Sequence, residues 1–215
     1  MKNLPNQFFY SKEEDRLNVI SHGIGFILSI IGLIFLLNKG LQDFNLLRFL
    51  SFLIYGISLS TMYIASTLYH NSKTPEGRYK FRLFDMVSIY LLIAGSYTPF
   101  TLTVLIDSGG LTLFLLVWVI AIIGIIWKIF TVGNYNVSST LLYIFMGGLW
   151  LFFIDAFINE IPQNALMWIY ASASTYLIGV FFYLADSKFK YNHFIWHIFV
   201  LFASTFHYIS IYFYI

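Results

Sequence analysis

The residues of this chain best suited to metal or acid–base chemistry are five histidines, and they are unevenly spaced. The closest pair lies in the segment His193-Phe-Ile-Trp-His197. Residues four apart on a helix project from nearly the same face, so both imidazoles can reach one ion. Two histidines do not hold zinc alone. A third nitrogen from His70 would complete the three-ligand set that, in catalytic zinc centres, leaves one coordination position open for water.

Two further polar residues could serve such a centre. Asp85 could orient the zinc-bound water or act as its base. Ser66 lies one helical turn before His70, and its hydroxyl either contacts a substrate oxyanion or hydrogen-bonds to its own helix. A histidine-rich set without thiolates favours Zn²⁺ and leaves copper, nickel and iron open. The structural alternative is that these histidines are interfacial, capping helices or hydrogen-bonding to neighbours.

The remaining two histidines are expected to be structural. His207 lies about 15 Å along the same helix from His197, which is too far for one ion to bind both. We therefore expect a hydrogen bond in the core for His207. His22 occurs beside Asn18 and Ser21, a grouping that favours hydrogen bonding between helices.

The composition indicates that the elements positioning these residues cross a membrane. Hydrophobic residues make up 59% of the 215 residues, only 10% are charged, and the mean hydropathy is +0.77. A soluble domain usually carries about 25% charged residues to solvate its surface. The net charge of +2 excludes a strongly basic nucleic-acid-binding surface. The absence of cysteine excludes disulfides, thiolate metal sites and a cysteine nucleophile.

Seven segments have roughly the 20 mostly apolar residues that a helix needs to span the bilayer. They are Leu17–Leu37, Phe49–Tyr69, Met86–Ile106, Leu111–Phe130, Val137–Ile154, Ala165–Ala185 and Phe194–Ile215. Apolar residues occupy both odd and even positions along these segments, which excludes the alternation of apolar and polar residues that a β-barrel strand needs. No small-residue cleavage pattern follows the first segment, so it is predicted to be retained. The sequence thus predicts an all-α membrane protein, one seven-helix domain over residues 1–215 with a polar tail at residues 1–16.

The distribution of Lys and Arg predicts the orientation of this domain. Ten of the twelve belong to the N-terminal tail and the 2–3, 4–5 and 6–7 connections, whereas the opposite side holds only Lys39 and Arg48. Positive charge concentrates on the cytoplasmic side of membrane proteins. We therefore expect a multi-pass plasma-membrane protein with its N-terminus in the cytoplasm and its C-terminus outside. The candidate metal ligands and Asp85 would then lie in the inner leaflet.

Four sequence motifs carry a family resemblance. They are Asn18-Val-Ile-Ser-His22-Gly, Ser66-Thr-Leu-Tyr-His70, the third-span stretches Phe84-Asp85-Met-Val-Ser-Ile-Tyr and Ile93-Ala-Gly-Ser-Tyr-Thr-Pro99-Phe, and His193-Phe-Ile-Trp-His197-Ile-Phe-Val running to His207. In this order the motifs resemble those of the bacterial haemolysin III proteins. These belong to the larger progestin and adipoQ receptor family, which includes the adiponectin receptors.

The resemblance implies seven helices, a cytoplasmic N-terminus and an intramembrane zinc near the inner leaflet. The zinc ligands that it implies are His70, His193 and His197, with Asp85 holding the zinc-bound water and Ser66 nearby. The chain departs from the family pattern at two positions. Asp15 stands where the family usually has glutamate, and Met86 stands where bacterial members often have histidine.

Three functions are open at this point. The leading hypothesis is a zinc-dependent hydrolase that cleaves a lipid amide bond, as ceramidases do, and takes part in membrane homeostasis. The first alternative is a non-enzymatic membrane receptor or sensor with a structural zinc and a lipid ligand. The second alternative, a pore-forming haemolysin, would need a polar stripe through several spans, and the fourth to sixth spans have almost none.

Overall fold

The computed structural model describes residues 10–42, 44–131, 136–186 and 188–215, and these residues form helices without any strand. Seven helical spans are long and apolar enough to cross a membrane, which confirms the predicted fold class. The helices and helical turns are α1 (Lys12–Gln42), α2 (Leu46–Asn71), α3 (Pro75–Thr101), η2 (Ile106–Gly110), α4 (Leu111–Thr131), α5 (Asn136–Gly147), η3 (Leu149–Phe153), α6 (Ile154–Glu160), α7 (Gln163–Leu184) and α8 (Asn192–Tyr214).

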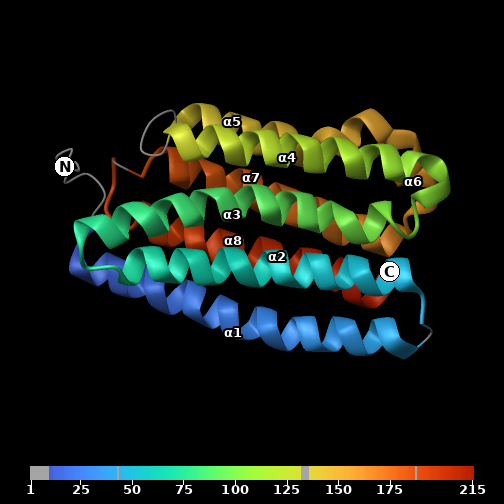
Figure 1. Cartoon of the computed structure of the whole chain (residues 1–215), viewed down its shortest axis with the longest axis horizontal. Coiled ribbons are helices and arrows are strands. Elements are labelled where there is room, and N and C mark those ends of the chain that lie inside the picture. The colour runs from blue at the N-terminus through green and yellow to red at the C-terminus, as the bar shows by residue number, and fades with distance from the viewer. Residues whose placement is uncertain (1–9, 43, 132–135, 187) are drawn as a thin grey trace.

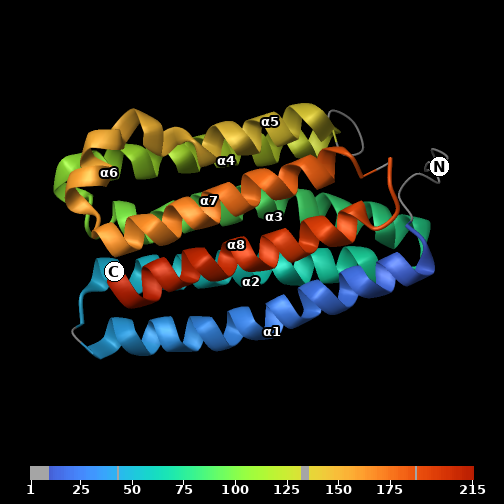
Figure 2. The same ribbon diagram turned by 180° about the vertical axis from the view of Figure 1, so that it is seen from behind.

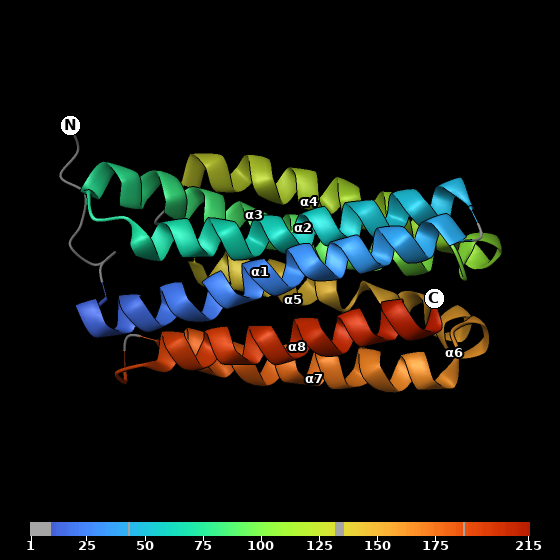
Figure 3. The same ribbon diagram turned by 90° about the horizontal axis from the view of Figure 1, so that it is seen from below.

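The helices run side by side as an elongated bundle, with the connections gathered at its two ends (Figure 1). Neighbours in sequence pack against each other, and α8 returns to pack against α1 as well as α7 (Figures 2 and 3). The start of α1 and the end of α8 lie at opposite ends of the bundle, as seven crossings require (Figure 1). We call the end where α1 begins, α2 ends and α8 begins the histidine end. Which end faces the cytoplasm stays a prediction from the charge distribution.

The third span begins eleven residues earlier than predicted, at Pro75 instead of Met86. Thr74 caps this helix by accepting a hydrogen bond from the backbone of Gly77, and Pro75 suits the first helical turn because it needs no donor there. Arg78, Lys80 and Arg82 therefore lie on α3 rather than in a connection. Asp85, expected at the start of the third helix, is ten residues inside it.

The same span also ends earlier than predicted, at Thr101 instead of Ile106. Pro99 lies in the last turn of α3, where its missing N–H weakens the continuing helix. The chain then bends through the π-helical turn η2, where Gly109 has a φ of 90° that disfavours side-chain-bearing residues. The fourth span accordingly starts in this turn and runs over Ile106–Thr131.

The first and fifth spans also extend beyond their predicted boundaries. Helix α1 begins at Lys12, so the end of the predicted polar tail is helical, while residues 1–9 of that tail lie outside the described residues. The fifth span continues to Glu160, beyond the predicted Ile154, because α6 follows the short turn η3. In both cases polar residues extend a helix past its apolar segment, which a hydropathy criterion does not detect.

The surface and the interior of the bundle divide as expected for a protein in lipid. Large apolar side chains are exposed along the outer faces, as at Ile27, Ile123 and Phe181. Tyrosines, histidines and small polar residues are buried between the helices together with apolar residues such as Leu36 and Phe52. Polar chemistry is thus concentrated inside the bundle.

Candidate metal centre

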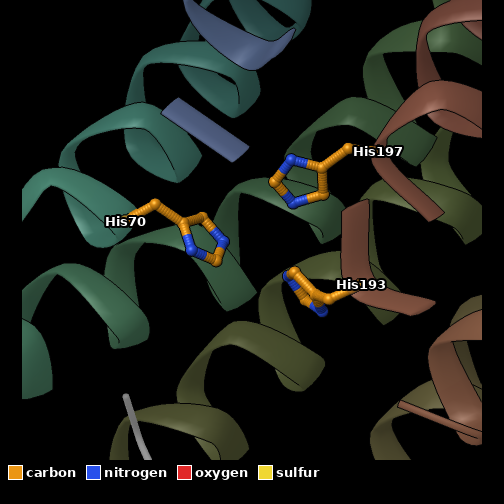
Figure 4. A group of neighbouring side chains, drawn as sticks. All are labelled: His70, His193 and His197. Carbon is orange, nitrogen blue, oxygen red and sulfur yellow. The ribbon is translucent and has the colours of Figure 1, made fainter. Parts of the chain in front are cut away.

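Three buried histidines face a common space at the histidine end of the bundle (Figure 4). His70 comes from the last turn of α2, and His193 and His197 come from the first turns of α8. One ring nitrogen from each can be chosen so that all three atoms lie within 4.8 Å of one another. The i, i+4 spacing therefore does place His193 and His197 on one face, and packing brings His70 opposite them.

The orientation of His70 is set by a carboxylate on a different helix. Its Nδ1 atom lies 2.9 Å from Oδ1 of Asp15 on α1, and the amide of Asn18 lies 3.3 Å from the same nitrogen. Since a carboxylate accepts, Nδ1 of His70 carries the proton in this arrangement. The opposite nitrogen, Nε2, is buried and has no hydrogen-bond partner among the described residues.

His193 has a similar arrangement with a second carboxylate. The hydroxyl of Tyr10 donates to Asp186 over 2.6 Å and lies 3.0 Å from Nδ1 of His193, while Asp186 itself is 3.3 Å from that nitrogen. Burial by itself would raise the pKa of Asp186. The hydrogen bond and the charge of His193, together with the hydrogen bond from Tyr10, outweigh burial and hold the pKa of Asp186 below its usual value. Nε2 of His193 is again buried, with no partner in the described part of the chain.

Tyr10 also covers the histidines from the end of the bundle. Its ring stacks on His193 at a centroid distance of 4.6 Å and lies 5.4 Å from the ring of His70. Burial raises the pKa of Tyr10 well above its usual value, so the hydroxyl stays protonated and remains a donor. Tyr10 therefore both orients one ligand and separates the cluster from the aqueous phase at this end.

His197 is held by a hydroxyl instead of a carboxylate. Its Nδ1 atom lies 3.3 Å from Oγ of Ser21, which donates its own proton to the backbone carbonyl of Asn18. The lone pairs of that oxygen are then available to Nδ1–H of His197. Helix α1 thus contributes an acceptor for His197 as well as for His70.

A buried arginine anchors the carboxylate that orients His70. Arg78 donates to Oδ1 of Asp15 over 2.7 Å and to the carbonyls of Tyr69 and His70, over 3.0 and 3.1 Å. Its guanidinium also lies 4.4 Å from the centre of the Tyr69 ring. Because Arg78 contacts the end of α2 and a side chain of α1 together, it links the two helices at the level of the metal ligands.

These residues fit a zinc ion. Zinc is commonly bound by neutral imidazoles whose other nitrogen donates to a carboxylate or another acceptor, which fixes the tautomer and the ring orientation. All three histidines have such an acceptor at Nδ1. Two have buried, unpartnered Nε2 atoms that would otherwise destabilise the fold. Three protein nitrogens also match the ligand number of an open zinc site.

Comparisons with known proteins identify the family of this chain. The family model described as "Haemolysin-III related" matches residues 10–208, nearly the whole described chain. The chain belongs to the haemolysin III family. It is 38% identical to "Hemolysin-3" of Bacillus cereus over 203 residues, covering 94% of this chain and 92% of that protein. It is 34% identical to the "Hemolysin-3 homolog" of Bacillus subtilis over 205 residues, covering 95% and 96%.

A more distant relative is human. The chain is 29% identical to "Monocyte to macrophage differentiation factor" of Homo sapiens over 171 residues, 75% of this chain and 69% of that protein. No solved structure matches the chain. The haemolysin III resemblance predicted from the motifs is thus confirmed, as is a multi-pass membrane protein.

In this haemolysin III family member, the two predicted catalytic residues lie beside the histidines. Ser66 is buried one turn before His70, and its hydroxyl makes no hydrogen bond to the carbonyls of its own helix. The proposed back-bonding is therefore not found, and the Ser66 hydroxyl faces the Asp85 carboxyl instead. The Asp85 carboxyl also lies close enough to His193 to be influenced by its charge. The cluster thus brings a carboxyl and a hydroxyl next to the candidate ligands.

The structural expectations for the other two histidines have different outcomes. Nε2 of His207 lies 3.1 Å from the carbonyl of Ser96, so the predicted hydrogen bond in the core is confirmed. Neither ring nitrogen of His22 makes a well-formed hydrogen bond among the described residues, although the ring lies against the backbone of His197 on α8. The ring of His22 instead stacks on His197, because α1 packs against α8 at this level.

Sequence reasoning missed the roles of Tyr10, Asp186 and Arg78. The signal for Asp15 was present, since the family comparison singled out its position, but its contact with His70 was not foreseen. Asp186 lies seven residues before His193 in a connection, where no periodicity links the two. Arg78 likewise reaches the site only through the packing of α3, and Tyr10 does so from the segment just before α1.

Proposed function

We propose that this haemolysin III family protein is a zinc-dependent hydrolase that cleaves the amide bond of a membrane lipid, as part of membrane homeostasis. The observation that carries this proposal is the set of three buried histidines whose Nδ1 atoms all have acceptors, next to a carboxyl and a hydroxyl. A purely structural zinc site is usually closed by four protein ligands. Three ligands beside two reactive groups fit a site that admits water and substrate.

Each residue has a defined part in this reaction. Zinc, when bound, supplies a Lewis acid that brings the pKa of water toward ~7 and polarises a carbonyl. Asp85 accepts a proton from the attacking water and delivers it to the amine nitrogen as the C–N bond breaks. Ser66 donates its hydroxyl proton in a hydrogen bond to the oxyanion that develops on the carbonyl oxygen. Tyr10, which lies just before the start of α1, limits entry of bulk water.

The position of the site favours a lipid over a soluble substrate. The histidines are buried inside a bundle whose outer faces carry large exposed apolar side chains. A substrate with a long acyl chain can approach from the bilayer, where its chain stays in an apolar environment. The polar interior between the helices then receives its amide group.

The test begins with the metal content of the detergent-purified protein, measured by elemental mass spectrometry. About one zinc per chain is expected, lost in the His193→Ala, His197→Ala double variant. The zinc-loaded protein is then incubated with N-acyl sphingosine and other amide and ester lipids. Release of fatty acid that disappears in Asp85→Ala supports the proposal. A zinc-loaded protein that hydrolyses none of these lipids contradicts it.

The second candidate is a receptor or sensor in which zinc is structural. The favouring observation is that the candidate ligands join α2 to α8, while α1 supplies the acceptors for His70 and His197. Zinc would then hold three helices together at one end of the bundle. On this candidate, His193→Ala lowers the thermal stability of the zinc-loaded protein and no lipid turnover is observed. A variant of unchanged stability would count against it. Red-cell lysis by the same preparation tests the pore hypothesis.

A further inference from the structure

His22 is a buried polar residue that the proposed reaction leaves without a role. It lies on α1, is 2% exposed, and both of its ring nitrogens are shielded from solvent without a hydrogen-bond partner among the described residues. An imidazole carries at least one N–H in either tautomer, and so needs at least one acceptor. A buried donor without a partner destabilises the fold. Such a side chain points to a polar group that completes its hydrogen bonding.

The ring of His22 is held firmly in place by its neighbours. It stacks on His197 with a centroid distance of 3.6 Å and an interplanar angle of 11°. The edge of the Tyr63 ring packs against it at 5.1 Å, and the Tyr63 hydroxyl is already paired with Ser204. Gly25 permits this packing, because a Cβ there would lie 2.5 Å from the Tyr63 ring. His22 therefore cannot readily turn toward another protein partner.

The stacking geometry also separates His22 from the metal ligands. Three histidines, His70, His193 and His197, offer nitrogens that lie close enough together for one ion, and His22 is not among them. Its ring lies parallel to that of His197, on the face of a ligand. His22 is thus packed against one candidate ligand and outside the set that would hold the ion, a position from which it can contact a molecule bound beside that ion.

We infer that His22 contacts the bound lipid, donating a hydrogen bond from its ring N–H to the carbonyl or carboxylate oxygen that lies beside the metal. This inference rests on the lipid ligand of the proposed function and adds a residue that recognises its polar head. An amide substrate offers a carbonyl oxygen, and the fatty acid released from it offers a carboxylate. Both are acceptors, which is the chemistry that the His22 N–H lacks within the protein.

The test compares His22→Phe with His207→Phe in the zinc-loaded, full-length protein. Phenylalanine keeps an aromatic ring for the stack and removes both nitrogens, and His207 is a second buried histidine away from the site. Oleate is the probe, with oleyl alcohol as the ligand that lacks a carboxylate, and zinc content is measured in every sample. We expect His22→Phe to keep its zinc and to bind oleate roughly 10- to 100-fold more weakly, as the loss of a hydrogen bond to a charged group predicts. Oleyl alcohol affinity and the oleate affinity of His207→Phe should stay near those of the wild type.

Three results would overturn the inference: loss of zinc in His22→Phe, unchanged oleate binding in that variant, or no oleate binding by the wild type. His22→Gln, which keeps an N–H donor, gives an independent reading if the phenylalanine variant does not fold, and should bind oleate better than His22→Ala does. Equal binding by those two variants would also overturn it. Failure of the proposed function is seen separately, as absence of lipid hydrolysis by the wild type while the effect of His22→Phe on oleate binding persists.

Discussion

The ion pair between Asp15 and Arg78 provides a test of how the candidate ligands are held. Replacing Asp15 with alanine removes the carboxylate that lies 2.7 Å from the guanidinium and 2.9 Å from Nδ1 of His70. The side chain of Arg78 is fully buried, whereas that of Asp15 is 17% exposed. The substitution therefore leaves a buried positive charge without its carboxylate and a ligand without its acceptor.

The expected magnitude follows from this burial. Removing one partner of a buried ion pair costs about 3–5 kcal/mol. The lower end applies here, because Asp15 is partly exposed and Arg78 keeps its bonds to the carbonyls of Tyr69 and His70. For a chain of this size, about 3 kcal/mol corresponds to a Tm lower by roughly 6–12 °C. Zinc affinity should fall by about 10- to 100-fold, as for other losses of an acceptor behind a histidine ligand.

The assay is thermal unfolding in detergent, followed by tryptophan fluorescence, with and without zinc. Asp155→Ala, which removes an exposed carboxylate near the opposite end of the bundle, is the matched control. The double variant Asp15→Ala, Arg78→Met removes both charges, so it should recover most of the stability without zinc while zinc affinity stays low. If Asp15→Ala unfolds at the same temperature as Asp155→Ala and binds zinc like the wild type, the assignment of this pair is refuted.

Three further predictions concern single side chains. Tyr10→Ala opens the end of the site, so a chelator should remove zinc at least about tenfold faster than from the wild type. Tyr10→Phe keeps the covering ring and should release zinc at an intermediate rate. Equal release rates in all three proteins would contradict this prediction. Gly25→Ala places a methyl group 2.5 Å from the Tyr63 ring and should lower the free energy of unfolding by about 1–3 kcal/mol. The matched control Gly23→Ala meets nothing within 4 Å, so the same unfolding assay should show unchanged or higher stability. His207→Phe should lower the free energy of unfolding by about 1 kcal/mol, because the hydrogen bond to the Ser96 carbonyl is lost. The zinc content of the purified protein should stay unchanged. A loss of zinc would place His207 in the metal site.

The sequence by itself determined the class of the protein and the depth of its reactive residues. Long apolar segments must form helices in a bilayer, because every backbone polar group has to be satisfied within its own segment. Once the spans are known, helical rise puts residues such as His70 and His193 at the same end of the bundle. The i, i+4 spacing then places His193 and His197 on one face, as the structure confirms. These are local properties of the chain and can be read without knowing its packing.

Only the tertiary structure decided which groups surround those histidines. Asp15 is 55 residues from His70 in sequence, and Tyr10 is 183 residues from His193, so no local period connects either pair. The start of α3 was also missed, because a polar helical turn looks like a loop in a hydropathy profile. The stacking of His22 on His197 depends on how closely α1 approaches α8. Helix positions along the membrane normal follow from apolar length, whereas the choice of neighbours and the rotation of each helix follow from side-chain packing between distant segments.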